Sequence, residues 1–161
     1  MASGRPPQSQ RSWASSSPAD TERVGAALAA LLRSGDVVLV EGELGAGKTT
    51  FVRAACRALG VATPVTSPTY TIGQLYPSPR GPVAHLDLYR GSGALSPEEW
   101  GDLEPYFEGT IAFVEWPAAG AGVLPAARAR VTIGVEGPDA RLITIDAPDP
   151  ELADALGHPL P

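Results

Sequence analysis

The residues whose types and spacing most clearly indicate chemistry lie between Gly42 and Thr49. The run GELGAGKT fits the pattern G-x-x-x-x-G-K-[ST], which is typical of loops that bind nucleotide phosphates. Glycines let such a loop turn tightly enough to aim several backbone N–H groups at one anion, and the following helix adds its positive end. The pattern predicts that Lys48 reaches the β- and γ-phosphates and that the Thr49 hydroxyl binds Mg²⁺.

Lys48 is also the only lysine in the sequence, since every other strongly basic side chain is an arginine. A phosphate-binding loop uses a compact ammonium group on a flexible stem, which the wider guanidinium does not replace. This exception favours the phosphate-binding interpretation over a glycine-rich turn that precedes a lysine by chance.

A strand pattern over residues 83–89 carries the first candidate acid. Period-2 geometry places His85 and Asp87 on one face of this strand. An acid at the end of an apolar strand is where P-loop proteins keep a group for Mg²⁺ or water. The structural alternative is that Asp87 pairs with Arg90 or caps a turn, and His85 is expected to be a hydrogen-bonded structural residue.

The second candidate acid, Glu115, ends a buried-type strand within residues 111–117. Mg²⁺ takes oxygen ligands and usually keeps several waters, so a glutamate here is a candidate to hold the ion directly or through water. The alternative is an ordinary salt bridge.

The rest of the sequence predicts the elements that must position these residues. A β-branched strand enters the loop and an amphipathic helix leaves it. Further helices are expected after Ser17 and after Ser96, because each serine precedes a proline suited to the first helical position. Alternating segments predict two hairpins, and small residues at 118–124 predict a mobile loop. The predicted elements are strand 36–40, helix 51–59, helix 18–32, hairpin 69–76 with 83–89, helix 97–107, strand 111–117, hairpin 130–135 with 141–145, and a helical turn at 151–156.

Length and composition limit the domain organisation and the location. The 161 residues suit one domain, which we place at residues 17–157, and the polar segment 1–16 is expected to be a disordered tail. Within that tail, Trp13 is the exception and either docks as a short edge segment or does nothing. The lone cysteine, Cys56, excludes an internal disulfide and suits a reducing cytoplasm, and we find no apolar run long enough to span a membrane.

The charge of the chain argues against strong binding of RNA or DNA by this chain alone. The formal net charge is −6, and the arginines are scattered rather than gathered. Proteins that hold nucleic acid by its phosphates usually present a basic face. Any approach to RNA is therefore expected to depend on a partner.

Four sequence blocks together resemble the TsaE family, the small bacterial ATPases of tRNA threonylcarbamoyladenosine biosynthesis. The blocks are GELGAGKTTF at 42–51, TSPTY at 66–70, HLDLYR at 85–90 and VEWP at 114–117. The resemblance implies an α/β fold, a three-layer sandwich of the P-loop NTPase type with a mixed parallel and antiparallel sheet. It also implies ATP hydrolysis that serves the TsaB–TsaD complex, which modifies adenosine 37 of ANN-decoding tRNAs, so that contact with tRNA is indirect.

The same resemblance implies roles for individual residues. Thr49 and Glu115 would bind Mg²⁺, Lys48 and Asp87 would be catalytic, with Asp87 near the γ-phosphate, and residues 66–70 would form a switch that senses that phosphate. Family members often carry an acid after the Glu-Trp-Pro unit, where this sequence has Ala118, so no role is carried over for that acid. The residues expected to hold ATP are Leu44, Gly45, Ala46, Gly47, Lys48, Thr49 and Thr50.

Two other functions fit the same motif. A small-molecule kinase of the P-loop type would need an acceptor pocket and usually an arginine-bearing lid, and no arginine-rich lid segment is visible. A nucleotide-gated adaptor without catalysis would tolerate loss of Asp87. For the ATPase we expect weak turnover by the isolated chain, because P-loop enzymes often depend on a partner to complete the site.

Overall fold

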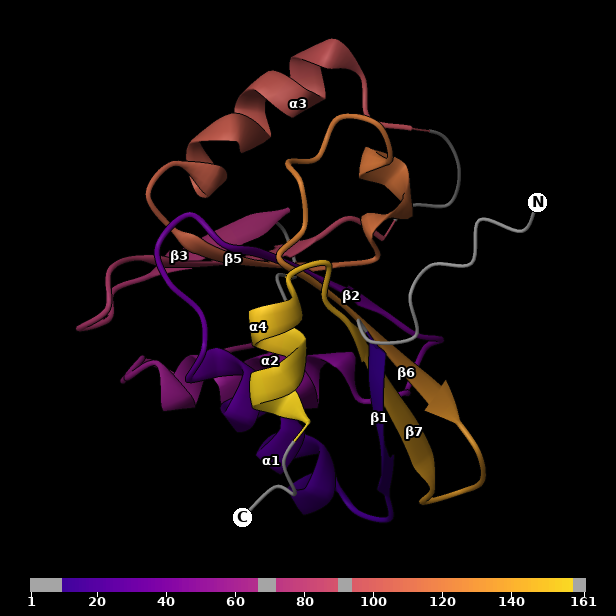
Figure 1. Ribbon diagram of the computed structural model, residues 1–161. Coiled ribbons are helices and arrows are strands. Elements are labelled where there is room, and N and C mark those ends of the chain that lie inside the picture. The colour runs from indigo at the N-terminus through magenta and orange to yellow at the C-terminus, as the bar shows by residue number, and fades with distance from the viewer. Residues whose placement is uncertain (1–9, 67–71, 90–93, 158–161) are drawn as a thin grey trace.

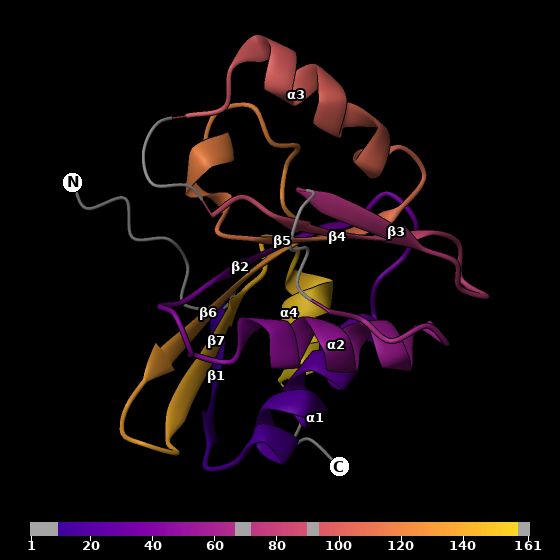
Figure 2. The same cartoon turned by 180° about the vertical axis from the view of Figure 1, so that it is seen from behind.

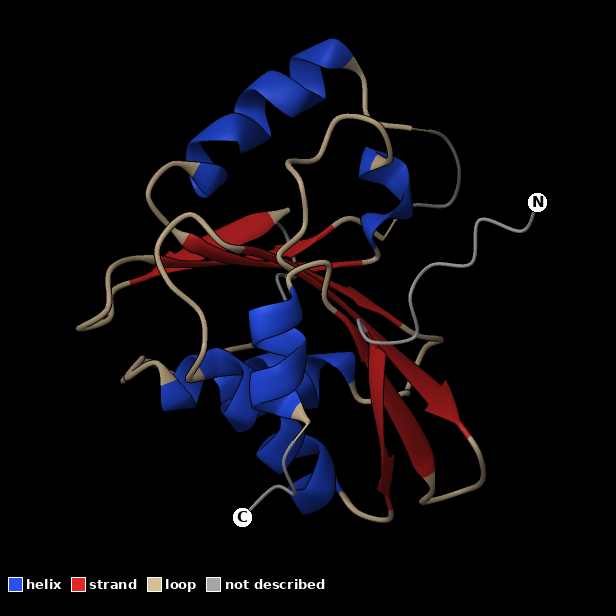
Figure 3. Cartoon of the chain, in the orientation of Figure 1, coloured by secondary structure: helices blue, strands red, loops and turns tan. Residues whose placement is uncertain are grey.

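A twisted mixed sheet forms the middle layer of the molecule, and helices cover both of its faces (Figures 1 and 3). The computed structural model describes residues 10–66, 72–89 and 94–157. In that part of the chain, seven strands are arranged in the order β1-β7-β6-β2-β5-β4-β3. Their bounds are Gln10–Ser15 for β1, Val37–Glu41 for β2, Gly73–Tyr76 for β3, Val83–Asp87 for β4, Ile111–Glu115 for β5, Ala129–Val135 for β6 and Arg141–Asp146 for β7.

The helices divide between the two faces of this sheet, which gives the predicted three-layer α/β sandwich. Helices α1 (Pro18–Ala29), α2 (Lys48–Ala58) and α4 (Pro150–Leu156) cover one face. Helix α3 (Pro97–Leu103) and its 3-10 extension η2 (Glu104–Phe107) cover the other, as the reverse view shows (Figure 2).

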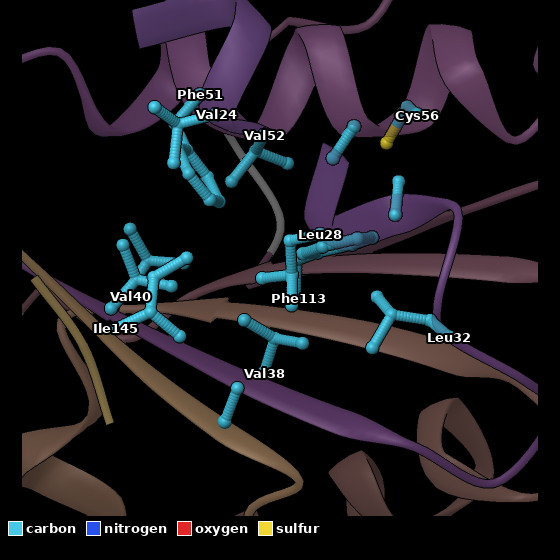
Figure 4. Close-up of a cluster of buried hydrophobic side chains, with 14 of the residues drawn as sticks. Val24, Leu28, Leu32, Val38, Val40, Phe51, Val52, Cys56, Phe113 and Ile145 are labelled. Atoms are coloured by element: carbon cyan, nitrogen blue, oxygen red, sulfur yellow. The ribbon is translucent and has the colours of Figure 1, made fainter. Parts of the chain in front are cut away.

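The larger apolar core lies between α1, α2 and the sheet (Figure 4). Phe51 of α2 and Phe113 of β5 are both fully buried there. Helices α1 and α2 approach so closely that a Cβ on Gly25 would lie 2.7 Å from the Phe51 carbonyl oxygen. Close packing of this kind fixes α2, and therefore the loop before it, relative to the strands.

The helix starts that the sequence predicts are confirmed. The Ser17 side chain caps α1 by accepting a hydrogen bond from the Asp20 N–H, and Ser96 forms a capping box with Glu99 at the start of α3. The two predicted hairpins are also present, as β3–β4 and β6–β7, both antiparallel. The predicted strand 69–76 is described only from residue 72 onward.

Two boundaries differ from the prediction. Residues 10–15, assigned to a disordered tail at 1–16, form β1, which pairs antiparallel with β7, and Ser16 donates hydrogen bonds to the Asp20 carboxylate. The alternative predicted for Trp13, docking as a short edge segment, is confirmed, because β1 is an edge strand of the sheet and Trp13 packs against the core. The other residues of the segment are small or polar, so its order comes from pairing with the distant β7. Residues 1–9 lie outside the described residues.

The second difference is the segment 118–124, predicted as a loop. It begins inside a 3-10 helix, η3 (Pro117–Gly120). Ala119 and Leu124 pack against the smaller apolar core, on the α3 side of the sheet. Among the described residues, no helix is both long enough and apolar enough to cross a membrane.

Candidate functional site

The loop between β2 and α2 has the backbone geometry that its glycines predict. Gly45 and Gly47 adopt φ values of 78° and 109°, in the left-handed region that side chains disfavour. Gly42 passes so close to β6 that a Cβ there would lie 2.7 Å from the Ile133 carbonyl oxygen. The loop therefore requires glycine at these positions for conformation and for space, and α2 starts directly after it at Lys48.

Three neighbouring parallel strands bring the loop and both candidate acids to one edge of the sheet. Strand β5 lies between β2 and β4, and Asp87 of β4 is in register with Glu115 of β5, which is in register with Val40 of β2. Residues in register on parallel strands point to the same face. Both carboxylates therefore face the layer that holds α2.

Glu115 lies directly beside the threonine that was predicted to share Mg²⁺ with it. The Thr49 hydroxyl is 3.3 Å from Oε1 and 3.4 Å from Oε2 of Glu115. The glutamate is only 2 % exposed, and its Oε2 also forms a short contact with Nε2 of His85, which is fully buried. The predicted pair is thus brought together, and the salt-bridge alternative is present at the same time, with His85 as partner.

His85 is the hydrogen-bonded structural residue that the sequence predicts, but its partner was not foreseen. Strand geometry places it on the same face as Asp87, one step below the edge of the sheet. Its Nδ1 has no hydrogen-bond partner among the described residues. Among the described residues, the only hydrogen-bonding contact of the imidazole is therefore the one between Nε2 and a carboxylate oxygen of Glu115.

Asp87 is half-buried at the end of β4 and accepts a hydrogen bond of 2.9 Å from the Tyr89 N–H. The turn-capping alternative is therefore observed, while Arg90 lies outside the described residues. Burial raises the pKa of Asp87 above its usual value, and the negative charge of Glu115 acts in the same direction. The hydrogen bond from Tyr89 and the charges of His85 and Lys48 oppose that shift.

Lys48 turns back over the loop that precedes it. Its Nζ donates hydrogen bonds to the carbonyl oxygens of Gly42 at 2.6 Å and Glu43 at 2.9 Å. Burial lowers the pKa of Lys48, and the acidic groups Glu115, Asp87 and Glu43 counteract that effect. The ammonium therefore lies at the floor of the site, held by main-chain oxygens and surrounded by carboxylates.

Trp116 lines the candidate site, although no role is predicted for it from the sequence. Its ring centroid lies 4.1 Å from the Lys48 Nζ, within cation–π distance, and the ring also contacts Tyr89. In the described part of the chain it is the one non-glycine residue with a positive φ, 53°. In the sequence it stands out as part of the VEWP block at 114–117 and by its place between Glu115 and Pro117, where a strand must stop.

Two adjoining cavities surround the loop. The first, of about 320 Å³, is lined by Leu44, Gly45, Gly47, Lys48, Thr49, Thr50, Asp87, Glu115 and Trp116. The second, of about 160 Å³, is lined by Ser17, Pro18, Thr21, Gly45, Ala46, Gly47, Thr50, Pro138, Asp139 and Arg141. All the predicted site residues thus line the first cavity except Ala46, whose buried side chain reaches only the second.

The oxygen atoms at this site suit Mg²⁺ held partly by a nucleotide. Among the described residues, no group of three or more histidine, cysteine, aspartate or glutamate side chains forms a complete metal cage. Mg²⁺ is ordinarily bound through one or two protein oxygens together with substrate phosphates and water. The hydroxyl of Thr49 and the carboxylate of Glu115 fit that requirement.

Comparison with known proteins agrees with the motifs. The chain is 37% identical over 139 residues to the tRNA threonylcarbamoyladenosine biosynthesis protein TsaE of Bacillus subtilis, covering 86% of each chain. It is 46% identical over 95 residues to the protein of the same name from Streptomyces coelicolor, covering 58% of this chain and 64% of that protein. The crystal structure of Bacillus subtilis YdiB superposes with a TM-score of 0.71 at 33% identity, covering 91% of this chain and 93% of YdiB.

The family model for threonylcarbamoyl adenosine biosynthesis protein TsaE matches residues 15–143, which include every residue of the first cavity. The likeness to YdiB agrees with a P-loop fold. The family model covers most of the sequence, and the Bacillus subtilis relative is aligned over nearly its whole length. The chain therefore belongs to the TsaE family, whose members are named as proteins of tRNA threonylcarbamoyladenosine biosynthesis.

Proposed function

We propose that this chain binds ATP with Mg²⁺ and hydrolyses it in support of N6-threonylcarbamoyladenosine formation at position 37 of ANN-decoding tRNAs. In this proposal it acts in the cytoplasm on the TsaB–TsaD complex and meets tRNA only through those partners. The observation that carries the proposal is the arrangement of Thr49, Glu115 and Asp87 around one phosphate-binding loop. Membership of a family named for tRNA modification would not by itself require a site with this arrangement.

Each side chain has a separable task in this proposal. Lys48 exchanges its bonds to the carbonyls of Gly42 and Glu43 for bonds to the β- and γ-phosphates. Thr49 and Glu115 hold Mg²⁺, which neutralises charge on the phosphates when bound. Asp87, with its carboxylate fixed by Tyr89, orients the attacking water or supports the metal.

The second cavity is suited to the nucleoside part of ATP. It shares Gly45, Gly47 and Thr50 with the first cavity, so a molecule that fills both runs continuously past the loop. Its lining includes the N-terminal turn of α1, at Ser17 and Pro18. Base and ribose therefore have a site that is separate from the triphosphate site.

Calorimetric titration of the full chain with ATP and Mg²⁺ tests the proposal directly. We expect saturable heat for the natural sequence and loss of binding by about a hundredfold for Lys48→Ala, because the ammonium contacts two phosphates. Arg130→Ala, which removes an exposed ion pair with Glu41, is the matched control and should bind normally. Absence of heat with well-folded natural protein would refute the nucleotide site.

Hydrolysis is tested by ADP release from the chain alone, with candidate small-molecule acceptors, and with TsaB–TsaD. We expect slow, acceptor-independent release that the partner complex accelerates, because partner-organised groups contribute roughly 10³–10⁵ in rate in other P-loop enzymes. Release that requires an acceptor would identify a kinase instead. Rapid hydrolysis without partners would contradict the accessory role.

A further inference from the structure

Arg141, the first residue of β7, forms hydrogen bonds with two separate pieces of backbone. Its Nε donates to the Ala46 carbonyl at 3.0 Å and its Nη2 to the Gly45 carbonyl at 3.2 Å, both in the phosphate-binding loop. Its Nη1 donates to the carbonyls of Gly137 and Ala140, each at 2.9 Å, in the β6–β7 turn. One guanidinium therefore joins the loop to a hairpin that is distant in sequence.

The partners found for this guanidinium in the described part of the chain are main-chain oxygens rather than a carboxylate. A guanidinium has a fixed, planar set of donors, so several bonds at once determine the orientation of the groups they reach. None of these hydrogen bonds goes to a carboxylate, so they leave the positive charge of Arg141 unneutralised. Its position beside Gly45 and Gly47 adds positive potential where an anion is expected.

The bond to Ala46 has a direct consequence for the amide that follows. In a trans peptide the N–H points away from the C=O, so fixing the Ala46 carbonyl toward Arg141 directs the Gly47 N–H to the opposite side. The neighbouring Ala46 N–H closes a turn to the Glu43 carbonyl at 3.1 Å. Gly47 itself, at φ 109°, has a backbone with little intrinsic preference, so an outside contact is needed to hold it.

We propose that Arg141 is a positioning residue that holds the carbonyls of Gly45 and Ala46, and thereby the Gly47 N–H, in the orientation in which the loop binds phosphate. This inference rests on the proposed nucleotide function. Arg141 acts through the loop backbone, and the β6–β7 turn acts as its anchor. Preorganised donors are worth most when they need no rearrangement on binding.

A competing role follows from the second cavity, because Arg141 also lines it together with Asp139. A direct contact with base or ribose would affect nucleoside recognition alone. Inorganic tripolyphosphate, which lacks a nucleoside, separates the two roles. The probes are therefore tripolyphosphate and ATP, each titrated with Mg²⁺ by calorimetry against the full chain.

The variants are Arg141→Lys, which keeps the charge without the fork of donors, and Arg141→Gln, which removes the charge. Arg130→Lys and Arg130→Gln are the matched controls, since Arg130 belongs to the same hairpin but pairs with the Glu41 side chain. We expect both Arg141 variants to lose about tenfold or more in affinity for tripolyphosphate and ATP alike, with both controls unchanged. Amide hydrogen exchange of residues 45–47 should also become faster in Arg141→Lys without nucleotide.

The other outcomes overturn the proposal. Loss of ATP affinity with tripolyphosphate binding intact would make Arg141 a nucleoside contact, and unchanged affinity for both would leave it without a role in binding. If both variants failed to fold, as judged by thermal unfolding, Arg141 would be a residue of the fold rather than of the site. Failure of the natural protein to bind either probe would instead refute the proposed function.

Discussion

The two halves of the sheet contribute to the site in different ways. In the central half, β4, β5 and β2 run parallel, so their carboxyl ends meet at one edge, and this edge holds Asp87, Glu115 and the phosphate-binding loop. In the outer half, β7 runs antiparallel to both β6 and β1, so its carboxyl end, at Asp146, lies at the opposite edge. The outer half reaches the loop through Arg141 and through the close approach of β6 to Gly42.

This difference shows why chemistry gathers on one half. A parallel arrangement repeats the same kind of strand end side by side, so that polar groups from distant parts of the sequence converge. An antiparallel arrangement alternates the ends and separates such groups. Substitutions at the parallel edge should therefore change binding or turnover while the fold persists, whereas core substitutions in the outer half should change stability alone.

The largest effect is expected for Asp87→Asn. Turnover with the partner complex should fall by roughly 10²–10⁴, the usual contribution of a positioned acid or base, while ATP affinity changes little. Asp146→Asn is the control from the outer half and should leave turnover unchanged. Steady-state hydrolysis and calorimetry measure the two quantities, and normal turnover of Asp87→Asn would support a non-catalytic adaptor.

A smaller effect is expected for Thr49→Ala, which removes the hydroxyl beside Glu115. Affinity for ATP should fall by about tenfold in the presence of Mg²⁺ and much less in EDTA, because the hydroxyl is proposed to act through the metal. The control is Thr144→Ala, whose hydroxyl pairs with Ser12 in the outer half. Equal losses with and without Mg²⁺ would show that Thr49 is not a metal ligand.

A further prediction concerns Cys56 in α2, a buried thiol that lies away from the edge of the sheet that holds Asp87 and Glu115. Burial raises the pKa of this thiol to about 12 from an ordinary 9.0. At pH values between these two pKa values, the Cys56 thiol is ionised in the unfolded chain and still protonated in the folded chain. The free energy of unfolding should therefore fall as pH rises through this window, by about 1.4 kcal/mol per pH unit.

Urea unfolding at about pH 9.5 and about pH 11, both inside this window, measures the slope for the natural chain and for Cys56→Ala. The alanine variant should lose the part of the slope that the thiol contributes, whatever its absolute stability. Identical slopes would mean that the thiol already ionises in the folded protein. Cys56 would then be a reactive group at the buried end of α2.

The smallest effect is expected for Ile143→Val in β7, a fully buried core position of the outer half. Loss of one methylene should lower the free energy of unfolding by about 0.5–1.5 kcal/mol and leave the ATP dissociation constant unchanged. Thermal unfolding and calorimetry provide the two readouts. A change in ATP affinity would show that the outer half is coupled to the site beyond the contacts of Arg141.

The sequence was most informative where the determining interactions are local. The glycines of the loop, the caps at Ser17 and Ser96, and the acids at strand ends each follow from residues a few positions apart. These signals were enough to predict the central strands, the helices and the proposed metal pair of Thr49 and Glu115.

What could not be predicted depends on contacts between distant segments. Strand β1 forms by pairing with the distant strand β7. The contact between His85 and Glu115 likewise requires β4 and β5 to be adjacent. The hydrogen bond of Arg141 to the loop joins two residues that are 95 positions apart in the sequence, Arg141 and Ala46. The left-handed backbone of Trp116 likewise has no signal in a residue type that normally avoids it.

The position of β1 has a practical consequence for how this protein is handled. Its six residues occupy the flank of β7, so their removal would leave a row of main-chain donors and acceptors open along a six-residue strand. Exposed flanks of this kind recruit strands from other molecules and promote self-association. A truncated protein that starts at Ser17, the boundary that composition suggests, is therefore expected to self-associate. A protein that starts at Gln10 keeps that flank of β7 covered.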